Sequence, residues 1–128
     1  MRDSLAGGSI HLAMGTYGVA AIRTLAEAHA KAEQVLVVAP VLGRPDLAAW
    51  GQLGIVAAGP QESVKRCEPL LALIGRRTFQ SGTKPETATA IKLANNMVSG
   101  AVIVAQAEAF SLVRKYGVAP QVRFEVMN

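Results

Sequence analysis

Cysteine is almost absent from this chain, and aromatic residues are scarce. The 128 residues include one cysteine, Cys67, which excludes an internal disulfide framework and a zinc site built from several thiolates. A lone thiol with no histidine or asparagine near it in sequence is typical of a structural residue in a reducing compartment, so we expect a cytoplasmic protein. Aromatic side chains make up 5% of the chain and are not interleaved with basic ones, which argues against a nucleic-acid surface.

Targeting signals and long apolar runs are also missing from the sequence pattern. Residues 1–9 lack the apolar centre of a secretory signal. The most apolar run, residues 97–105, is far shorter than the roughly 20 residues that a membrane-spanning helix needs. The sequence therefore predicts a protein without a membrane partner.

Small aliphatic residues make up most of what is present. Hydrophobic residues account for 51% of the chain, enough for the core of one ordinary domain. The net charge of +4 comes from 13 basic and 9 acidic residues spread along the chain. This distribution favours a solvated surface or a small anionic ligand. His11 and His29 lack the spacing of metal ligands, so we expect core or surface roles for them and no metal site.

Strand and helix patterns alternate along the first two thirds of the chain. The predicted strands span residues 7–16, 34–43, 53–59 and 76–82. The predicted helices between them span residues 18–33, 44–52 and 60–75. Apolar runs without polar alternation are typical of strands buried on both faces, and this order predicts an α/β fold with a parallel sheet and right-handed crossovers. Pro69 is expected to break or kink the third helix.

One long helix is expected to follow, over about residues 86–116. Pro85 lies near its start and Gly117 at its end, the usual positions for these residue types. Apolar residues occupy more than one face of this helix, so it must be covered on several sides. Because the rest of the chain cannot cover it, a partner chain or a missing segment is implied, and we expect a homo-oligomer formed through the long helix. Residues from 119 onward are expected to begin another helix.

Lys92 and Asn96 stand four residues apart on the long helix and therefore project from one face. An amine among apolar neighbours has a destabilised charged form, which suits a group that exchanges protons near neutral pH. The adjacent carboxamide can orient the amine or hold a substrate hydroxyl. The alternative is a lysine whose stem covers apolar surface while its amine stays in water. On this pair alone, the second interpretation describes most lysines.

Two turns follow predicted strands, at the ends where α/β folds bind ligands. In the first, Thr16 is a candidate cofactor contact or a helix cap. In the second, Gly43 allows backbone amides to approach a ligand closely, and Arg44 offers its guanidinium to a carboxylate. An ordinary turn with a solvated arginine accounts for the second pattern equally well. The sequence contains no Gly-x-Gly-x-x-Gly phosphate loop.

Taken together and in this order, the motifs resemble the β-hydroxyacid dehydrogenase family, which includes the 3-hydroxyisobutyrate dehydrogenases. The family's substrate-binding motif, Ala-Pro-Val-Ser-Gly-Gly, stands here as residues 39–44, with Leu42 in place of the serine and Arg44 in place of the last glycine. Its Lys-x-x-x-Asn motif on a long helix stands as residues 92–96. Imine reductases, a sister group, usually lack the lysine, so Lys92 argues against them.

The resemblance implies an NAD(P)-dependent oxidoreductase that interconverts a small hydroxy acid and its semialdehyde or keto acid. It implies that Lys92 is the general acid/base and that Thr16 contacts the NAD or NADP cofactor. The residues that it places at the small anionic substrate are Leu42, Gly43, Arg44 and Asn96. Leu42 lacks the hydroxyl that the family offers to the substrate's carboxylate, and Arg44 is expected to compensate.

The same resemblance implies that the chain corresponds to the middle of a longer enzyme. Residues 1–84 resemble the second half of a Rossmann-like NAD(P)-binding domain. Residues 85–128 resemble the linking helix and the beginning of an all-α dimerisation domain. Since the family's dinucleotide loop has no counterpart in this sequence, the alternative is a catalytically inactive truncated fragment that serves only in association.

Overall fold

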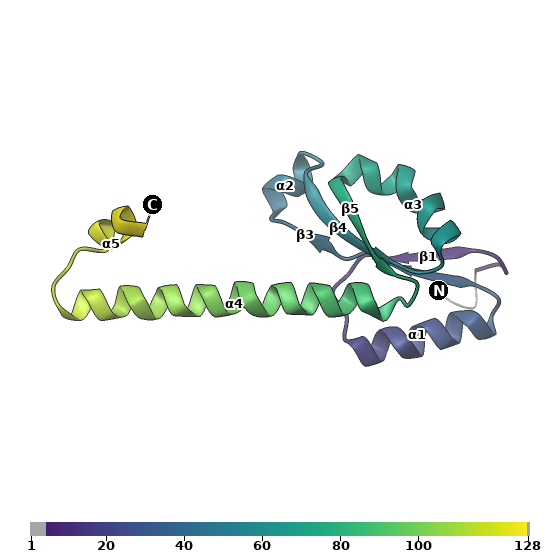
Figure 1. Ribbon diagram of the computed structural model, residues 1–128, viewed down its shortest axis with the longest axis horizontal. Helices are drawn as coiled ribbons and strands as arrows, with labels where there is room; N and C mark the ends of the chain where they lie inside the picture. The colour runs from purple at the N-terminus through teal and green to yellow at the C-terminus, as the bar shows by residue number, and fades with distance from the viewer. Residues whose placement is uncertain (1–4, 128) are drawn as a thin grey trace. The chain divides into compact units, whose positions relative to one another are not determined.

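The computed structural model describes residues 5–127, which divide between Leu93 and Ala94 into two compact units (Figure 1). In chain order, the elements of the first unit are β1 (Ile10–Ala13), α1 (Val19–Lys31), β2 (Val35–Val38), β3 (Val41–Leu42), α2 (Pro45–Ala49), β4 (Leu53–Ala58), α3 (Gln61–Ile74) and β5 (Gly75–Gly82). Helix α4 (Glu86–Lys115) begins in the first unit and continues into the second, which also contains α5 (Pro120–Met127). The predicted α/β fold followed by one long helix is confirmed.

The sheet is mixed, whereas the sequence pattern predicted parallel strands throughout. Strand β1 pairs with β2 in parallel, and β4 pairs with β5 in parallel. The two pairs run in opposite directions, because β4 is antiparallel to β2 at Val38↔Ala58 and to β3 at Val41↔Ile55. The reason is the short connection between β3 and β4. It includes only the five-residue helix α2, and a parallel crossover needs about a dozen residues or more.

Strands β2 and β3 occupy the segment that the sequence predicted as one strand, residues 34–43. Pro40 separates them and has no N–H to donate to a neighbouring strand. Its carbonyl still accepts a 3.1 Å hydrogen bond from the backbone N–H of Val56, so the pairing with β4 continues past the break. The first half of this segment therefore lies beside β1 and the second half beside β4.

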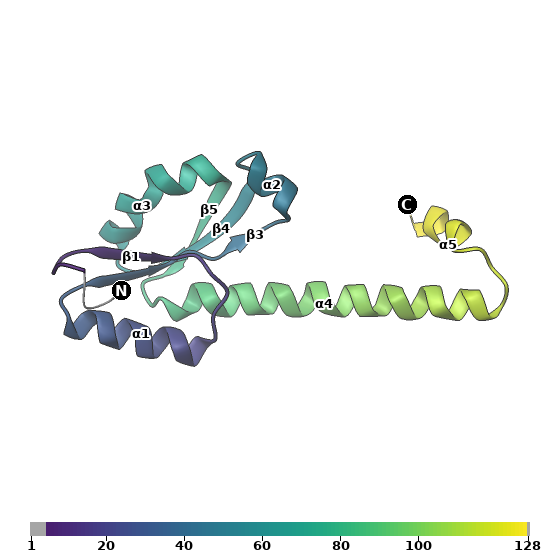
Figure 2. The ribbon, with the colours of Figure 1, turned by 180° about the vertical axis from the view of Figure 1, so that it is seen from behind.

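Helices cover both faces of the sheet, and α1 and α3 lie on opposite sides of it (Figures 1 and 2). On one face, Ile22 of α1 and Ala88 of α4 pack with strand residues in an apolar cluster. On the other face, the α3 residues Val64, Cys67 and Leu71 pack in a second cluster. Successive residues of β2 alternate between the two clusters, as the two-residue period of a strand requires.

Helix α3 runs unbroken through Pro69, so a break at this residue is wrong, and a kink there stays a prediction. A proline in a helix deprives the carbonyl four residues earlier of its hydrogen bond, and here that carbonyl belongs to Lys65. Both residues are exposed, so water can solvate this carbonyl. Cys67 is buried beside them in the α3 cluster, as expected of a structural thiol, and burial raises the pKa of its thiol.

Helix α4 has the bounds that the sequence predicted, within one residue at its end. By length and composition it also meets the criterion for a helix that can cross a membrane. The run at residues 97–105 is short, but the residues on either side of it are also largely apolar. The apolar part of the helix is therefore longer than that run indicated. A single helix of this kind is weak evidence for a membrane, because core helices of other proteins meet the same criterion.

Candidate functional site

Lys92 reaches the sheet from the second turn of α4. The helix begins after β5, and its residues Ala88 and Thr89 are buried within the first unit. Lys92 lies one turn after Ala88 and points toward the same face of the sheet. Its Nζ donates a 2.7 Å hydrogen bond to the backbone carbonyl of Val41 in β3. The amine is thus held by the main chain and is half-buried, unlike the fully solvated amine of the alternative interpretation.

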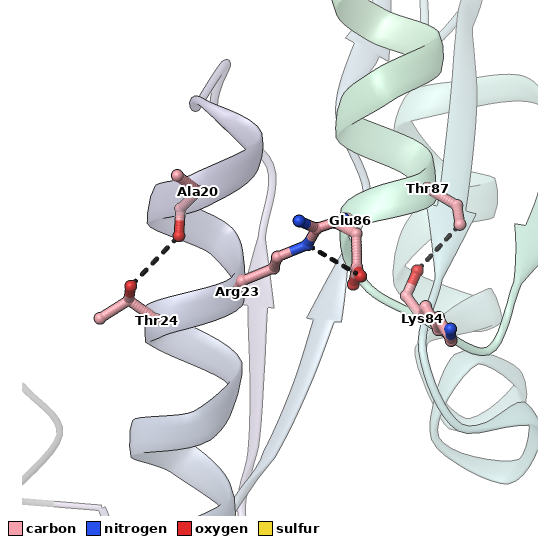
Figure 3. A network of polar contacts seen from close by, with 6 residues as sticks. All are labelled: Ala20, Arg23, Thr24, Lys84, Glu86 and Thr87. Carbon is pink, nitrogen blue, oxygen red and sulfur yellow. Dashed lines mark hydrogen bonds and ion pairs between the residues drawn. The ribbon is translucent and has the colours of Figure 1, made fainter.

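The start of α4 is fixed by polar contacts on two sides. Arg23 of α1 and Glu86 form an ion pair, with Nε and Oε1 3.3 Å apart (Figure 3). The hydroxyl of Thr87 donates a 2.8 Å hydrogen bond to the carbonyl of Lys84 in the turn before the helix (Figure 3). A hydrogen bond from its own backbone N–H, reinforced by Arg23, lowers the pKa of the Glu86 carboxyl. These contacts add to the burial of Ala88 and Thr89 in positioning the first turns of α4, from which Lys92 extends.

Gly43 ends β3 with a φ of +142°, a conformation that other residues rarely adopt. A Cβ atom here would lie 2.8 Å from Cδ2 of Leu53 and 3.4 Å from Cδ1 of Leu47. The sequence motif suggested that this glycine admits a ligand to the backbone. The structure gives it a second role, because the φ of this turn favours glycine and a Cβ atom here would force the end of the Leu53 side chain to shift.

Arg44 follows this turn and carries a side chain that is 80% exposed. Its Nη2 donates a 2.9 Å hydrogen bond to Oδ2 of Asp46, and Pro45 between them is the first residue of α2. This hydrogen bond is the main reason that the pKa of the Asp46 carboxyl is lowered. Sequence reasoning missed Asp46, although the spacing Arg-Pro-Asp at a helix start was a usable signal.

Thr16 lies in the exposed turn after β1. Strands β1 and β2 are parallel, so their carboxyl ends lie side by side. The turn that holds Thr16 follows β1 at this end of the sheet, and β3 begins shortly after β2 at the same end. Gly18, and not Thr16, occupies the N-cap position of α1, so the capping interpretation is wrong. The ring of Tyr17 folds over Gly15, where a Cβ atom would lie 2.9 Å from the phenol.

Asn96 belongs to the second unit and is exposed. It shares α4 with Lys92, and the helix is continuous between them. The structure thus brings the Lys92 amine to β3, beside Leu42 and within a few residues of Arg44. Thr16 lies at the same end of the sheet, after the carboxyl end of β1.

A buried polar chain through His29 was missed by sequence reasoning. The Nδ1 of His29 lies 2.7 Å from Oε1 of Gln34, and its Nε2 lies 2.8 Å from Nδ1 of His11. Gln34 donates its amide N–H to the carbonyl of Leu5, so its oxygen accepts from His29 Nδ1 and the proton of His11 Nδ1 points to His29. Burial, reinforced by His29, lowers the pKa of His11.

These histidines join α1 to β1 by a direct contact between their rings. Within residues 5–127, no three histidine, cysteine, aspartate or glutamate side chains are grouped to hold a metal ion. Two hollows in the structure also lie away from the Lys92 amine. One, of about 490 Å³, is lined by α4 residues from Ile103 to Lys115. The other, of about 200 Å³, lies beside α1 and includes Gln34.

Two family models together match almost the whole chain. Residues 1–82 match the model described as the NAD binding domain of 6-phosphogluconate dehydrogenase. Residues 87–128 match the model described as the NAD-binding part of NADP-dependent 3-hydroxyisobutyrate dehydrogenase.

Individual relatives agree with the family models. The chain is 37% identical to the uncharacterized oxidoreductase YfjR of Bacillus subtilis, over 100% of this chain and 45% of the relative. It is 35% identical to 3-hydroxyisobutyrate dehydrogenase of Pseudomonas aeruginosa, over 97% of this chain and 41% of the relative. A crystal structure of 3-hydroxyisobutyrate dehydrogenase from Salmonella typhimurium shares the fold, with a TM-score of 0.89 and 24% identity over 98% of this chain and 44% of that one. The chain thus spans less than half the length of these relatives.

Proposed function

The chain belongs to the family of the 6-phosphogluconate dehydrogenase NAD-binding domain, among its β-hydroxyacid dehydrogenase members, and from this we propose that it carries the acid/base residue of an NAD(P)-dependent oxidoreductase. That residue is Lys92. The observation that carries the proposal is the 2.7 Å hydrogen bond from its amine to the carbonyl of Val41. It holds the amine beside residues 39–44, which resemble the family's substrate-binding motif, and so supports a role for the amine at a substrate bound there.

In the proposed reaction a small hydroxy acid and its semialdehyde or keto acid are interconverted. The C–H bond of the hydroxyl-bearing carbon breaks and its hydrogen departs with both electrons as hydride. The hydroxyl proton passes to the Lys92 amine, and the oxygen becomes a carbonyl. In the reverse direction the Lys92 ammonium returns the proton to the developing alkoxide. NAD or NADP supplies the hydride acceptor or donor when it is bound.

The residues present fit one end of such a cofactor. Thr16 is exposed just after the carboxyl end of β1, and α/β folds bind ligands at the carboxyl ends of their strands. The chain has no glycine-rich loop of the kind that cradles a pyrophosphate. We therefore assign to Thr16 a contact with the cofactor and assign no pyrophosphate cradle to the residues of this sequence.

The substrate's carboxylate is assigned to the turn after β3. Arg44 donates one N–H to Asp46. Its exposed guanidinium has further N–H donors for a bidentate contact with the substrate's carboxylate. Gly43 has no side chain and is proposed to let the carboxylate approach the backbone of this turn closely. Asn96, one turn from Lys92 on α4, is proposed to hold the hydroxyl or carbonyl of the substrate.

We also propose that α4 pairs with a second copy of the chain in the cytoplasm. Its exposed apolar residues include Met97, Val98, Val102, Ile103 and Val104. A patch of this size on a helix marks an interface more often than a free surface. Besides this second copy, the proposed function needs a small anionic substrate as its partner. It needs neither a nucleic acid nor a membrane. In the alternative, a truncated fragment that serves only in association, the Lys92 contact would have a purely structural role, joining α4 to β3.

A turnover assay on the complete gene product tests this function. Oxidation of a panel of small hydroxy acids is followed by the absorbance of the reduced nicotinamide, with NAD and NADP supplied separately. The proposal expects turnover with at least one acid and one cofactor. A pure, folded protein that binds neither cofactor and oxidises none of the acids would show that it is wrong.

A further inference from the structure

Tyr17 follows Thr16 in the turn after β1, and its ring lies over the backbone of Gly15. A Cβ atom at Gly15 would lie 2.9 Å from both Cζ and the phenol oxygen of Tyr17. The ring therefore occupies the space that a side chain at residue 15 would fill. Tyr17 is nevertheless 41% exposed, so a ligand at this end of the sheet can reach it.

The alternation of side chains along β1 indicates on which face of the sheet the ring lies. Met14 packs against the apolar cluster on the α3 face. Ala13 packs on the opposite face, in the cluster that also contains Ala88 of α4. Since successive residues of an extended chain point to opposite faces, a Cβ atom at Gly15 would point to the face of Ala13. The Tyr17 ring, which fills the place of that atom, lies on the same face.

The Lys92 amine approaches this end of the sheet from the same face, because α4 packs there. The backbone N–H of Ala39 donates a 2.8 Å hydrogen bond to the carbonyl of Ala13. The end of β1 is thus joined to the segment that leads into Val41, whose carbonyl accepts the Lys92 hydrogen bond. From Ala39 to Val41 the backbone spans at most about 7 Å. The tyrosine ring and the amine therefore lie on neighbouring segments of one face.

A nicotinamide ring must lie near this amine if the proposed reaction takes place here. Hydride moves directly between the cofactor and the reacting carbon, whose hydroxyl has to lie within hydrogen-bond reach of Lys92. The nicotinamide ring is positively charged in the oxidised cofactor and neutral in the reduced one. The face of an aromatic ring attracts a cation through its quadrupole. An exposed tyrosine ring beside the nicotinamide would therefore stabilise the oxidised form more than the reduced form.

We propose that the ring of Tyr17 contacts the nicotinamide and favours binding of the oxidised cofactor over the reduced one. The inference rests on the proposed function, because it takes Lys92 to mark the place where substrate and cofactor meet. It adds a second cofactor contact beside Thr16 and a preference between the two redox forms.

The test measures how both redox forms bind to the complete gene product, with NAD and NADP each tried. Calorimetry gives the Kd of the oxidised cofactor, and fluorescence titration gives that of the reduced one. Tyr17→Leu should raise the Kd of the oxidised form by about three- to tenfold and that of the reduced form by less than about twofold. Tyr17→Phe keeps the aromatic face and should leave both values unchanged. Tyr116→Leu is the matched control, because Tyr116 is 80% exposed just after α4.

Gly15→Ala moves the ring without removing it. The added Cβ atom would lie 2.9 Å from the Tyr17 ring, which must shift to make room. This variant should therefore also weaken binding of the oxidised form selectively. In a Tyr17→Leu background, the same substitution should cause no further loss. If thermal unfolding shows that Tyr17→Leu does not fold, Gly15→Ala alone must show the selective loss.

Each remaining outcome decides a different statement. Equal losses for the two redox forms in Tyr17→Leu, or no loss in either, overturn the inference and leave the proposed function standing. A Tyr17→Phe variant that binds the oxidised form as weakly as Tyr17→Leu does the same, because it would assign the effect to the hydroxyl and not to the ring. A folded wild type that binds neither redox form overturns the proposed function, and the inference with it.

Discussion

The Lys92 amine donates its hydrogen bond to the main chain of Val41, 51 residues earlier in the sequence, and not to a side chain. The position of the amine therefore depends on the backbone path of β3 and on where α4 begins. Substitutions that disturb the turn after β3 should displace the acceptor. Substitutions of exposed residues elsewhere should not.

Gly43→Ala should lower the free energy of unfolding by about 1–3 kcal/mol. Alanine at a φ of +142° is strained, and its Cβ would overlap Cδ2 of Leu53. The measurement is urea denaturation. Gly100→Ala is the control, because Gly100 is inside α4 and a Cβ there meets no atom within 4 Å. Alanine favours a helix interior over glycine, so this variant should be no less stable. Equal stability of the two variants would contradict the role assigned to the turn.

The His11–His29 pair should make the protein less stable in mild acid. The pKa of His11 is lowered from its ordinary value of 6.5 in the folded protein, so the unfolded chain takes up the proton first as the pH falls. Stability should therefore be highest above pH 6.5 and decrease as the pH falls below it. Urea midpoints at about pH 7.5 and about pH 5.5, on either side of that value, measure this loss. In His11→Gln the decrease should be smaller, and an equal decrease in both proteins would refute the assignment.

Arg44→Gln should raise KM for the acid substrate by roughly 10- to 100-fold, the scale of a hydrogen bond to a charged group. The effect on kcat should be smaller, because Arg44 holds the substrate and does not exchange protons with it. Arg77→Gln is the control, since Arg77 is an exposed arginine on β5 whose guanidinium lies 4.5 Å from the ring of Phe79. A rise in KM of the same size in both variants would show that only net charge matters.

Val102→Glu should dissociate the proposed oligomer. Val102 is 54% exposed in the isolated chain, and burying a carboxylate in an apolar interface is costly. Light scattering coupled to gel filtration should give a multimer for the wild type and a smaller species for the variant. Val126→Glu, at an 80% exposed position on α5, is the comparison. A wild type that is monomeric at micromolar concentration would rule out this interface.

Periodic and compositional signals were sufficient for most of the fold. Pro85, Gly117 and the long helical pattern between them located α4 almost to the residue. The strands were predictable because short, uninterrupted aliphatic runs bounded by turn residues are typical of buried strands. The direction of β4 was mispredicted, since it depends on how short α2 is, and short helices have weak patterns. The continuation of α3 past Pro69 depends on whether water can reach the carbonyl of Lys65, and no local sequence pattern indicates this.

The site was only partly predictable, for a physical reason. Glycine, arginine and lysine at motif positions indicate what chemistry is available, and on that basis Gly43, Arg44 and Lys92 stay predictions of the candidate site. The contact between Lys92 and Val41 depends on how α4 packs on the sheet, which no local pattern encodes. The pairing of His11 with His29 likewise joins a strand to a helix through the rotamers of two rings.

Turnover of the complete gene product carrying Lys92→Ala tests the central claim most directly. Loss of a general acid/base typically costs roughly 10²- to 10⁴-fold, so we expect kcat to decrease by about a hundredfold or more. Cofactor affinity, measured in parallel by fluorescence titration, should be nearly unchanged. Lys31→Ala, which removes an exposed lysine at the end of α1, is the control and should turn over normally. Normal turnover in Lys92→Ala would contradict the account.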